Sequence, residues 1–198
     1  IEIMGKIFYL MGKSSSGKDT LYRGLRIEFP QLKPVVLYTT RPMREGEQDG
    51  VDYYFIDDDK VELLKSQQKI IEIREYNTIY GIWKYMTVDD GNIDIKSENY
   101  LMIGTLESYA KIREYFGEKN LVPLYIHVED GERLIRAVKR EQMQSSPKYA
   151  ELCRRFLADE KDFSQENLKA AGIEHYFNNI SRNKCIKKLA DYINKLIE

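Results

Sequence analysis

The segment GKSSSGKDT, residues 12–20, has the residue types and the spacing of a phosphate-binding loop. In the pattern G-x-x-x-x-G-K-[ST], glycines free successive backbone N–H groups to form a cradle for phosphate oxygens, and the lysine reaches the β- and γ-phosphates. Gly12, Gly17 and Lys18 satisfy this pattern, whereas Asp19 stands where a hydroxyl residue is usual. We therefore predict that this segment binds the phosphates of ATP.

The same loop contains a candidate metal position. Asp19 directly follows the lysine, and Thr20 comes next. A carboxylate is a hard oxygen ligand for Mg²⁺, so we predict that these two side chains hold this ion. The alternative is that Asp19 only caps the following helix. The loop residues predicted to contact ATP are Gly12, Lys13, Ser14, Ser15, Ser16, Gly17, Lys18, Asp19 and Thr20.

A second segment able to do chemistry is TTRPMREGEQDGVDY, residues 39–53. Arg41 and Arg44 lie three positions apart, and Tyr53 ends the segment. Guanidinium groups bind phosphate oxygens through two parallel hydrogen bonds, and a tyrosine hydroxyl can donate another. These residue types indicate a site for the phosphate of an acceptor substrate.

The phosphate-binding loop needs a strand before it and a helix after it. Residues 6–11, KIFYLM, form a short apolar run suited to a strand buried in a parallel sheet. Leu21, Leu25 and Phe29 then repeat at helical spacing until Pro30 ends the pattern. This context favours a nucleotide-binding loop over the alternative of a simple Gly/Ser turn.

The rest of the chain alternates between strand and helix patterns, which predicts a parallel sheet covered on both faces. A region of alternating apolar and charged residues predicts a small antiparallel sheet inserted into this order. We expect further strands at residues 34–38, 51–56, 69–76, 79–88, 100–104, 121–128 and 174–178. We expect further helices at residues 57–68, 107–116, 132–142 and 148–168, and an amphipathic one carrying Ile186, Leu189, Ala190, Ile193 and Ile197 at the end of the chain.

Composition limits the possible partners. The 198 residues include 31 Lys and Arg and 32 Asp and Glu, a net charge of −1, which gives no global basis for binding nucleic acid or an anionic membrane. Cys153 and Cys185 have no C-x-x-C spacing, so neither a disulfide framework nor a zinc site is expected. No apolar run is long enough to span a bilayer, and a cytoplasmic location is expected. The oligomeric state cannot be predicted.

Beyond these patterns, the chain resembles the guanylate kinase family over almost its full length. Residues 37–55, LYTTRPMREGEQDGVDYYF, match the family segment S-x-T-T-R-x-x-R-x-G-E-x-x-G-x-D-Y except at the initial serine. IIEIREYNTIYG, residues 70–81, resembles the acceptor-binding stretch F-I-E-x…Y-G. The resemblance implies that the acceptor phosphate contacts Arg41, Arg44, Tyr53 and Tyr80 and that Glu72 faces the purine. A carboxylate can accept both the N1 and the 2-amino hydrogens of guanine.

The resemblance also implies a helical lid with arginines that neutralise the transferring phosphoryl group. Arg136, Arg140 and Arg155 fall at the matching positions and, with Lys18, are the predicted catalytic residues. The alternative is that these arginines are solvated side chains on helix faces. Asn179 lies near the family's adenine-binding asparagine and is a candidate for contacting ATP.

These features predict an α/β, three-layer P-loop fold with a parallel central sheet. We expect a kinase core over residues 1–36 and 94–198, with a lid at about 137–154, and a small mixed or antiparallel insertion over residues 37–93 that binds a nucleoside monophosphate. The predicted function is ATP-dependent, Mg²⁺-assisted phosphorylation of GMP to GDP.

Three positions in the predicted base pocket depart from the family pattern. Leu37 and Ile82 replace small hydroxyl residues, and Thr105 stands where an aspartate is expected. Thr105 remains a candidate acceptor-binding residue, but Leu37 and Ile82 cannot hydrogen-bond a base through their side chains. The alternatives are therefore a kinase for another nucleoside monophosphate, or a non-catalytic guanylate kinase-like domain that binds a phosphorylated ligand. Retention of the phosphate loop favours an enzyme.

Overall fold

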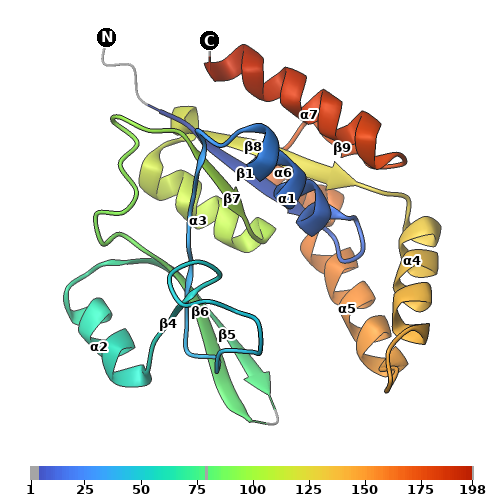
Figure 1. Cartoon of the computed structure of the whole chain (residues 1–198), viewed down its shortest axis with the longest axis horizontal. Coiled ribbons are helices and arrows are strands. Elements are labelled where there is room, and N and C mark those ends of the chain that lie inside the picture. Colours follow the sequence, from blue (N-terminus) through green and yellow to red (C-terminus); the bar gives the residue numbers. More distant parts are fainter. Residues whose placement is uncertain (1–4, 79, 198) are drawn as a thin grey trace.

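The computed structural model describes residues 5–78 and 80–197, which form two β-sheets and their covering helices (Figure 1). The larger sheet is parallel throughout and has the strand order β2-β7-β1-β8-β9. The bounds of its strands are β1 Ile7–Gly12, β2 Lys33–Pro34, β7 Tyr100–Ile103, β8 Leu121–His127 and β9 Phe177–Asn178. The predicted parallel central sheet is confirmed.

Helices cover both faces of this sheet, because alternate side chains of the fully buried β1 point to opposite sides. Phe8 and Leu10 pack with α1 (Lys18–Glu28) and α7 (Arg182–Ile197). Tyr9 packs on the other side with α3 (Leu106–Phe116) and with residues at the end of α5 (Tyr149–Asp162) and in α6 (Gln165–Ala170). The remaining helices are α2 Asp58–Ser66, α4 Asp130–Gln142 and the short 3₁₀ helix η1 Glu118–Asn120.

The smaller sheet has the order β4-β3-β6-β5 and lies on one side of the molecule (Figure 1). Its strands β3 and β4 pair in parallel, whereas β6 pairs antiparallel with both β3 and β5. The strand bounds are β3 Tyr38–Thr39, β4 Tyr54–Phe55, β5 Ile70–Thr78 and β6 Gly81–Val88. The predicted antiparallel pairing of the last two is confirmed, although residue 79 of the predicted strand lies outside the described residues.

Two predicted elements are wrong in extent. The expected single strand at residues 34–38 is divided, since β2 joins the larger sheet and β3 the smaller one while the chain crosses between them. The expected single helix at 148–168 is two helices, because Ser164 adopts an extended conformation and its side chain caps the second by accepting a hydrogen bond from the Asn167 N–H.

Two predicted strands are shorter than expected. The strand at 51–56 is reduced to Tyr54–Phe55, since the amides of Val51 and Asp52 both bond the Gln48 carbonyl in a turn. The strand at 174–178 is reduced to Phe177–Asn178. Across the described part of the chain, no helix has both the length and the apolar character needed to cross a bilayer.

Candidate active site

The phosphate-loop segment connects β1 to α1 and has the backbone shape of an anion cradle. Ser15 and Gly17 have positive φ angles of 62° and 83°. A Cβ atom at Gly12 would lie 2.7 Å from the Ile126 carbonyl oxygen, and one at Gly17 would lie 2.5 Å from Asn179 Nδ2. Both positions therefore require glycine, because a side chain would force this close packing apart.

The polar groups of the loop are available for a ligand. The amide N–H groups of Ser15, Gly17, Lys18 and Asp19 have no hydrogen-bond partner among residues 5–78 and 80–197. The hydroxyls of Ser15 and Ser16 are the side-chain N or O atoms in these ranges that are buried without a partner. Such groups are costly unless something satisfies them, and phosphate oxygens accept hydrogen bonds from both N–H and O–H donors. The loop thus fits a polyphosphate.

Lys18 and Asp19 are the first two residues of α1, directly after the loop. The Lys18 side chain is 21% exposed, its Nζ is 3.7 Å from Asp19 Oδ2, and the Asp19 side chain is 74% exposed. Lys18 lines a cavity of about 750 Å³, together with Gly12 and Ser14 of the loop. No cluster of three or more His, Cys, Asp or Glu side chains suited to a metal occurs in the described residues. A cation beside Asp19 would therefore complete its coordination with other oxygens, such as those of phosphates.

Arg133, which was not predicted, is a buried hub between the loop and the helices α4 and α5. Its Nε donates to the Ser14 carbonyl at 3.0 Å, and its Nη atoms donate to Asp159 and Glu160, each at 3.1 Å. The side chain is 1% exposed, and its guanidinium lies 4.8 Å from the ring centroid of Phe156. The Asp159 carboxylate also accepts the Ser14 N–H at 2.8 Å. One loop residue is thus held by both its backbone groups.

Lys13 extends this ion network. Its Nζ donates to Glu160 at 2.5 Å and to Asp130 at 3.4 Å. Burial alone would raise the pKa of Asp130, but its hydrogen bond from Arg133 and the nearby Lys13 charge lower it below the ordinary value. The network therefore joins three segments of the chain that are distant in sequence: the loop, the start of α4 and the end of α5.

The three predicted lid arginines lie at different distances from the loop. Arg155 Nη2 donates to Ser14 Oγ at 3.3 Å, and Arg155 and Arg140 line a small cavity beside Ser14 and Ser15. Arg136 instead donates to the Asn179 carbonyl at 3.1 Å. It reaches the loop only through Asn179, whose Nδ2 donates to the Ser16 carbonyl at 2.8 Å. The structure thus brings Arg140 and Arg155 to the loop and places Arg136 behind it.

On the predicted acceptor side, Arg41 is buried and engaged by a carboxylate. Its Nη1 and Nη2 donate to the two oxygens of Glu47 at 2.9 and 2.8 Å, and its guanidinium lies over the rings of Tyr53 and Phe55. Hydrogen bonds from Arg41 and from the Arg44 N–H hold the pKa of Glu47 at about 2. The exposed Arg44 guanidinium makes no hydrogen bond to any described residue.

Glu72 is buried between β5 and the start of α3. Thr87 donates to its Oε1 at 2.8 Å, while Ser108 and Arg74 Nε donate to its Oε2, each at 3.1 Å. Thr105 caps α3 by accepting the Ser108 N–H at 3.2 Å, and it also lines the large cavity. Glu72 and Thr105 thus lie on either side of Ser108, as parts of one polar cluster.

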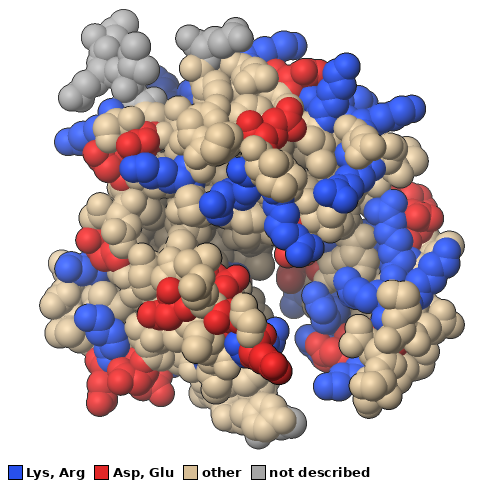
Figure 2. Space-filling model, viewed as in Figure 1, with Lys and Arg blue, Asp and Glu red and all other residues tan. Residues whose placement is uncertain are grey.

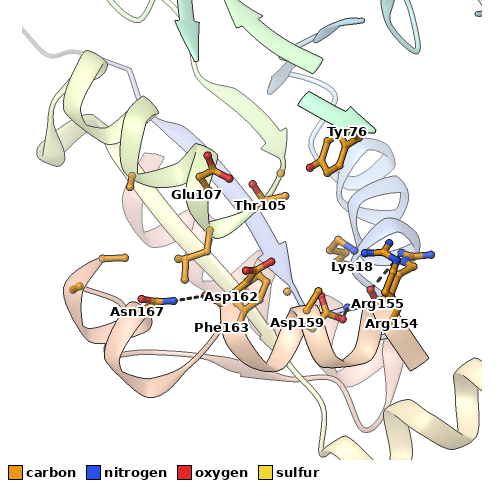
Figure 3. Close-up of a pocket in the computed structure, with 18 residues that line it drawn as sticks. Lys18, Tyr76, Thr105, Glu107, Arg154, Arg155, Asp159, Asp162, Phe163 and Asn167 are labelled. Carbon is orange, nitrogen blue, oxygen red and sulfur yellow. Dashed lines mark hydrogen bonds between the residues drawn. The ribbon is translucent and has the colours of Figure 1, made fainter. Parts of the chain in front are cut away.

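Tyr80, another predicted acceptor ligand, is 77% exposed and stacks on Trp83, with ring centroids 6.1 Å apart. Neither ring lines the large cavity, whereas Tyr76 does. Figure 3 shows Lys18 and Arg155 at one end of this cavity, below Tyr76, and Asn167 at the other end. Figure 2 shows the surface hollowed between the smaller sheet and the α4–α5 pair, with Lys and Arg side chains on the helical wall.

Arg133 and Asp159 could have been found from the sequence. Arg133 precedes Arg136 and Arg140 by three and seven positions, and Asp159 follows Arg155 by four, so each shares a helix face with a predicted residue. Tyr76, which lines the cavity, and Arg74, which bonds Glu72, carry no comparable signal, because their positions depend on which face of β5 meets α3. The other charged residues lining the cavity are Glu107, Arg154 and Asp162.

A phosphate loop between the first strand and first helix of a parallel sheet, facing a second small sheet across a cavity, defines a nucleotide-binding protein of the phosphate-loop class. Residues 4–195 match the family model described as guanylate kinase, and the chain belongs to this family.

Individual relatives agree with this membership. The chain is 30% identical over 141 residues to a guanylate kinase from Chlorobium chlorochromatii, covering 70% of this chain and 72% of that protein. It is 42% identical over 82 residues to one from Rhodopseudomonas palustris strain HaA2, covering 41% of this chain. The alignments span only 36% and 37% of the first two curated relatives, from Thermobifida fusca and Rhodopseudomonas palustris.

A solved structure confirms the fold. The crystal structure of guanylate kinase from Anaplasma phagocytophilum superposes with a TM-score of 0.67 at 20% sequence identity, covering 98% of this chain and 87% of that one.

Proposed function

We propose that the protein transfers the γ-phosphoryl group of ATP to the phosphate of GMP, forming ADP and GDP. The observation that carries this proposal is that the donor and acceptor sides border one cavity. The phosphate loop, which has unpaired amides, lines it through residues that include Lys18, and the candidate acceptor residue Thr105 lines it as well. Direct transfer requires positioning and charge neutralisation more than a covalent nucleophile. Family membership supports the choice of GMP.

On the donor side, residues 12–20 bind the phosphates of ATP, and the Lys18 ammonium stabilises charge on the β- and γ-phosphates. Asn179, whose amide fixes the Ser16 carbonyl, extends this site toward the adenine. Mg²⁺, when bound, neutralises charge on the phosphates. Asp19 and Thr20 are its proposed ligands.

On the acceptor side, the proposed contacts of the acceptor phosphate are the free Arg44 guanidinium and the hydroxyls of Tyr53 and Tyr80. Arg41 joins them when that phosphate competes with Glu47 for its two Nη donors. Glu72 and Thr105 border the base. The insertion at residues 37–93, which contains the whole smaller sheet, is the proposed acceptor-binding unit.

Arg155 and Arg140 are close enough to the loop to neutralise the transferring phosphoryl group. Arg136 holds the Asn179 carbonyl in this structure, and it would join them if its side chain turned toward the cavity on closure. Closure of α4 and α5 over the cavity would exclude water from the reaction. A cytoplasmic location remains a prediction from the sequence.

The test is an assay of ADP formation from ATP with GMP, dGMP, AMP, CMP, UMP and dTMP as acceptors. We expect GMP to be used with the highest kcat/KM. Preference for another acceptor would keep the enzyme class and change the substrate. No turnover with any acceptor, combined with calorimetric binding of a phosphorylated ligand, would show a non-catalytic binding domain.

The proposed metal ligand is tested separately by titrating activity with Mg²⁺ in wild type, Asp19→Asn and Asp19→Ser. If the carboxylate binds the ion, Asn raises the Mg²⁺ midpoint more than it weakens metal-free nucleotide binding. Ser retains partial activity, because a hydroxyl can take the same coordination position. Identical midpoints in all three proteins would show that Asp19 is not a metal ligand and only lies in the first turn of α1, whose N-cap is Gly17.

A further inference from the structure

Arg74 lies on the same face of β5 as Glu72 and Tyr76, since side chains two positions apart in a strand point the same way. Glu72 contacts Ser108 of α3, and Tyr76 lines the large cavity. Arg74 therefore lies between the start of α3 and the cavity, although nothing in the sequence marked it as a site residue.

The Glu72 carboxylate has little capacity left for a ligand. Its side chain is 0% exposed, and Thr87, Ser108 and Arg74 already donate to it. Two carboxylate oxygens offer about four acceptor positions, and both positions of Oε2 are in use here. Accepting two adjacent N–H groups of a base would require the loss of the Ser108 or Arg74 bond. Glu72 is thus better placed to orient Arg74 than to read a base.

The donors that remain free belong to Arg74. Its Nε bonds Glu72, but Nη1 and Nη2 have no hydrogen-bond partner in residues 5–78 and 80–197. They are not among the buried unpaired atoms of these ranges, and the side chain is 10% exposed, so its outer end reaches solvent. Burial would lower the pKa of Arg74, but the Glu72 charge and the Tyr76 and Tyr9 hydroxyls raise it above the ordinary value. The guanidinium therefore stays charged and keeps both outer nitrogens as donors.

The surroundings favour a flat, uncharged ligand. Arg74 and Glu72 form a neutral pair, which offers a phosphate dianion less attraction than the Lys18 and Arg44 sites do. Tyr85 lies opposite Arg74 in the β5–β6 ladder, and its ring packs edge-on against Tyr76 at 5.6 Å. Two donors beside the exposed Tyr76 ring and the half-buried Tyr85 ring match the edge of a nucleobase.

We propose that Arg74 is a specificity-determining residue, which donates two hydrogen bonds to adjacent acceptor atoms on the base, the O6 and N7 of guanine. Adenine offers N7 beside an amino donor and cannot accept both bonds. The guanidinium supplies the donors that Leu37 and Ile82, as apolar residues, lack. This inference rests on the proposed kinase function and names the group that selects its acceptor.

The wild-type protein can be tested with base analogues in both binding and turnover. 7-deazaguanosine monophosphate lacks the N7 acceptor, and inosine monophosphate keeps O6 and N7 but lacks the 2-amino group. We expect the deaza analogue to bind about 10-fold more weakly than GMP, the discrimination typical of a two-bond contact. Inosine monophosphate should bind within about threefold of GMP. Equal affinity for GMP and its deaza analogue would overturn the proposal. Much weaker binding of inosine monophosphate than of the deaza analogue would overturn it as well.

Two variants extend the test. Arg74→Lys keeps a cation beside Glu72 but loses the two-pronged donor, so GMP and the deaza analogue should bind equally; Arg74→Gln should do the same if it folds. Glu75→Gln, an exposed neighbour pointing to the opposite face, is the control and should keep the wild-type preference. Equal weakening of all nucleotides by Arg74→Lys would indicate a phosphate contact and refute the base contact. Because calorimetry needs no turnover, failure of the kinase proposal would be seen separately, as binding without ADP formation.

Discussion

The phosphate-loop side and the acceptor side of the cavity both hold arginines against carboxylates, but they do so over very different sequence distances. Arg41 and Glu47, like Arg74 and Glu72, belong to one sheet or its adjoining loop. In contrast, Lys13 pairs with Glu160 of α5, and Arg133 of α4 bonds the Ser14 carbonyl. Local pairs move as one body with their element, whereas the loop pairs break when α4 and α5 move away. The acceptor-side pairs therefore do not depend on the position of α4 and α5, whereas the loop contacts do.

Lys18→Ala should have the largest effect, because Lys18 is the loop lysine that is not paired with carboxylates of α4 and α5. We expect kcat to fall by about 10²–10³-fold with an unchanged fold, as expected when a group stabilising the transition state is lost. Lys13→Ala is the matched control, since its Nζ is already neutralised by Glu160 and Asp130, and it should lose less than about 10-fold. Steady-state kinetics and circular dichroism measure both. Equal losses would mean that Lys13 also acts on the phosphates.

Replacing Arg41 and Arg44 should distinguish an arginine that is already paired with a carboxylate from one whose guanidinium is unpaired among the described residues. Arg41→Ala leaves Glu47 without its main partner and should lower the free energy of unfolding by about 3 kcal/mol, besides raising the acceptor KM. Arg44→Ala should raise the acceptor KM alone, and neither variant should change ATP binding much. Urea unfolding and calorimetry distinguish these effects. A comparable loss of ATP affinity in either variant would contradict the assignment to the acceptor.

Asp159→Asn tests whether this carboxylate of α5 competes with nucleotide for the loop. The amide oxygen can still accept the Ser14 N–H, but the negative charge beside the phosphates is gone. ATP should bind about fivefold more tightly, because like charges repel and one negative charge beside the phosphates is removed. Asp162→Asn is the control, because Asp162 also lines the cavity but its side chain makes no bond to the loop. An equal gain in ATP affinity in both variants would show that the effect comes from the net charge of the cavity and not from the Asp159 contact with the loop.

The last prediction concerns acid stability on the acceptor side and involves no change in activity. The pKa of Glu47 is lowered from 4.5 to about 2, so the folded state gains stability that is complete above pH 4.5. This gain is lost as the pH falls from 4.5 toward 2. Glu47→Gln should therefore be less stable than wild type at pH 7 and approach it near pH 2. Urea midpoints between pH 7 and 2 measure this difference, and a difference independent of pH would rule out the Glu47 carboxylate as its source.

The fold and the position of the phosphate loop between a strand and a helix could be predicted because their signals are local. The loop spacing, the helix repeat after Lys18 and the alternation in β5 and β6 all reflect neighbours along the chain. The boundary between α5 and α6 depends on a single cap at Ser164. It could not be predicted, because the residues on both sides of Ser164 continue a helical pattern. The proposed role of Arg74 has no local signal in the sequence, because it depends on the packing of β5 on α3, which brings Ser108 to the Glu72 carboxylate that bonds Arg74.

The loop also illustrates how selection for binding can act against thermal resistance. Ser15 is held at a φ of 62°, and the hydroxyls of Ser15 and Ser16 are buried without partners. Strain and unsatisfied polar groups both lower the stability of the unliganded chain, while a bound polyphosphate would satisfy those hydroxyls. Ser15→Gly and Ser16→Ala would remove part of this burden. Selection for heat-resistant variants would thus favour substitutions at these serines, and the resulting proteins would have a higher Tm and a lower affinity for nucleotide.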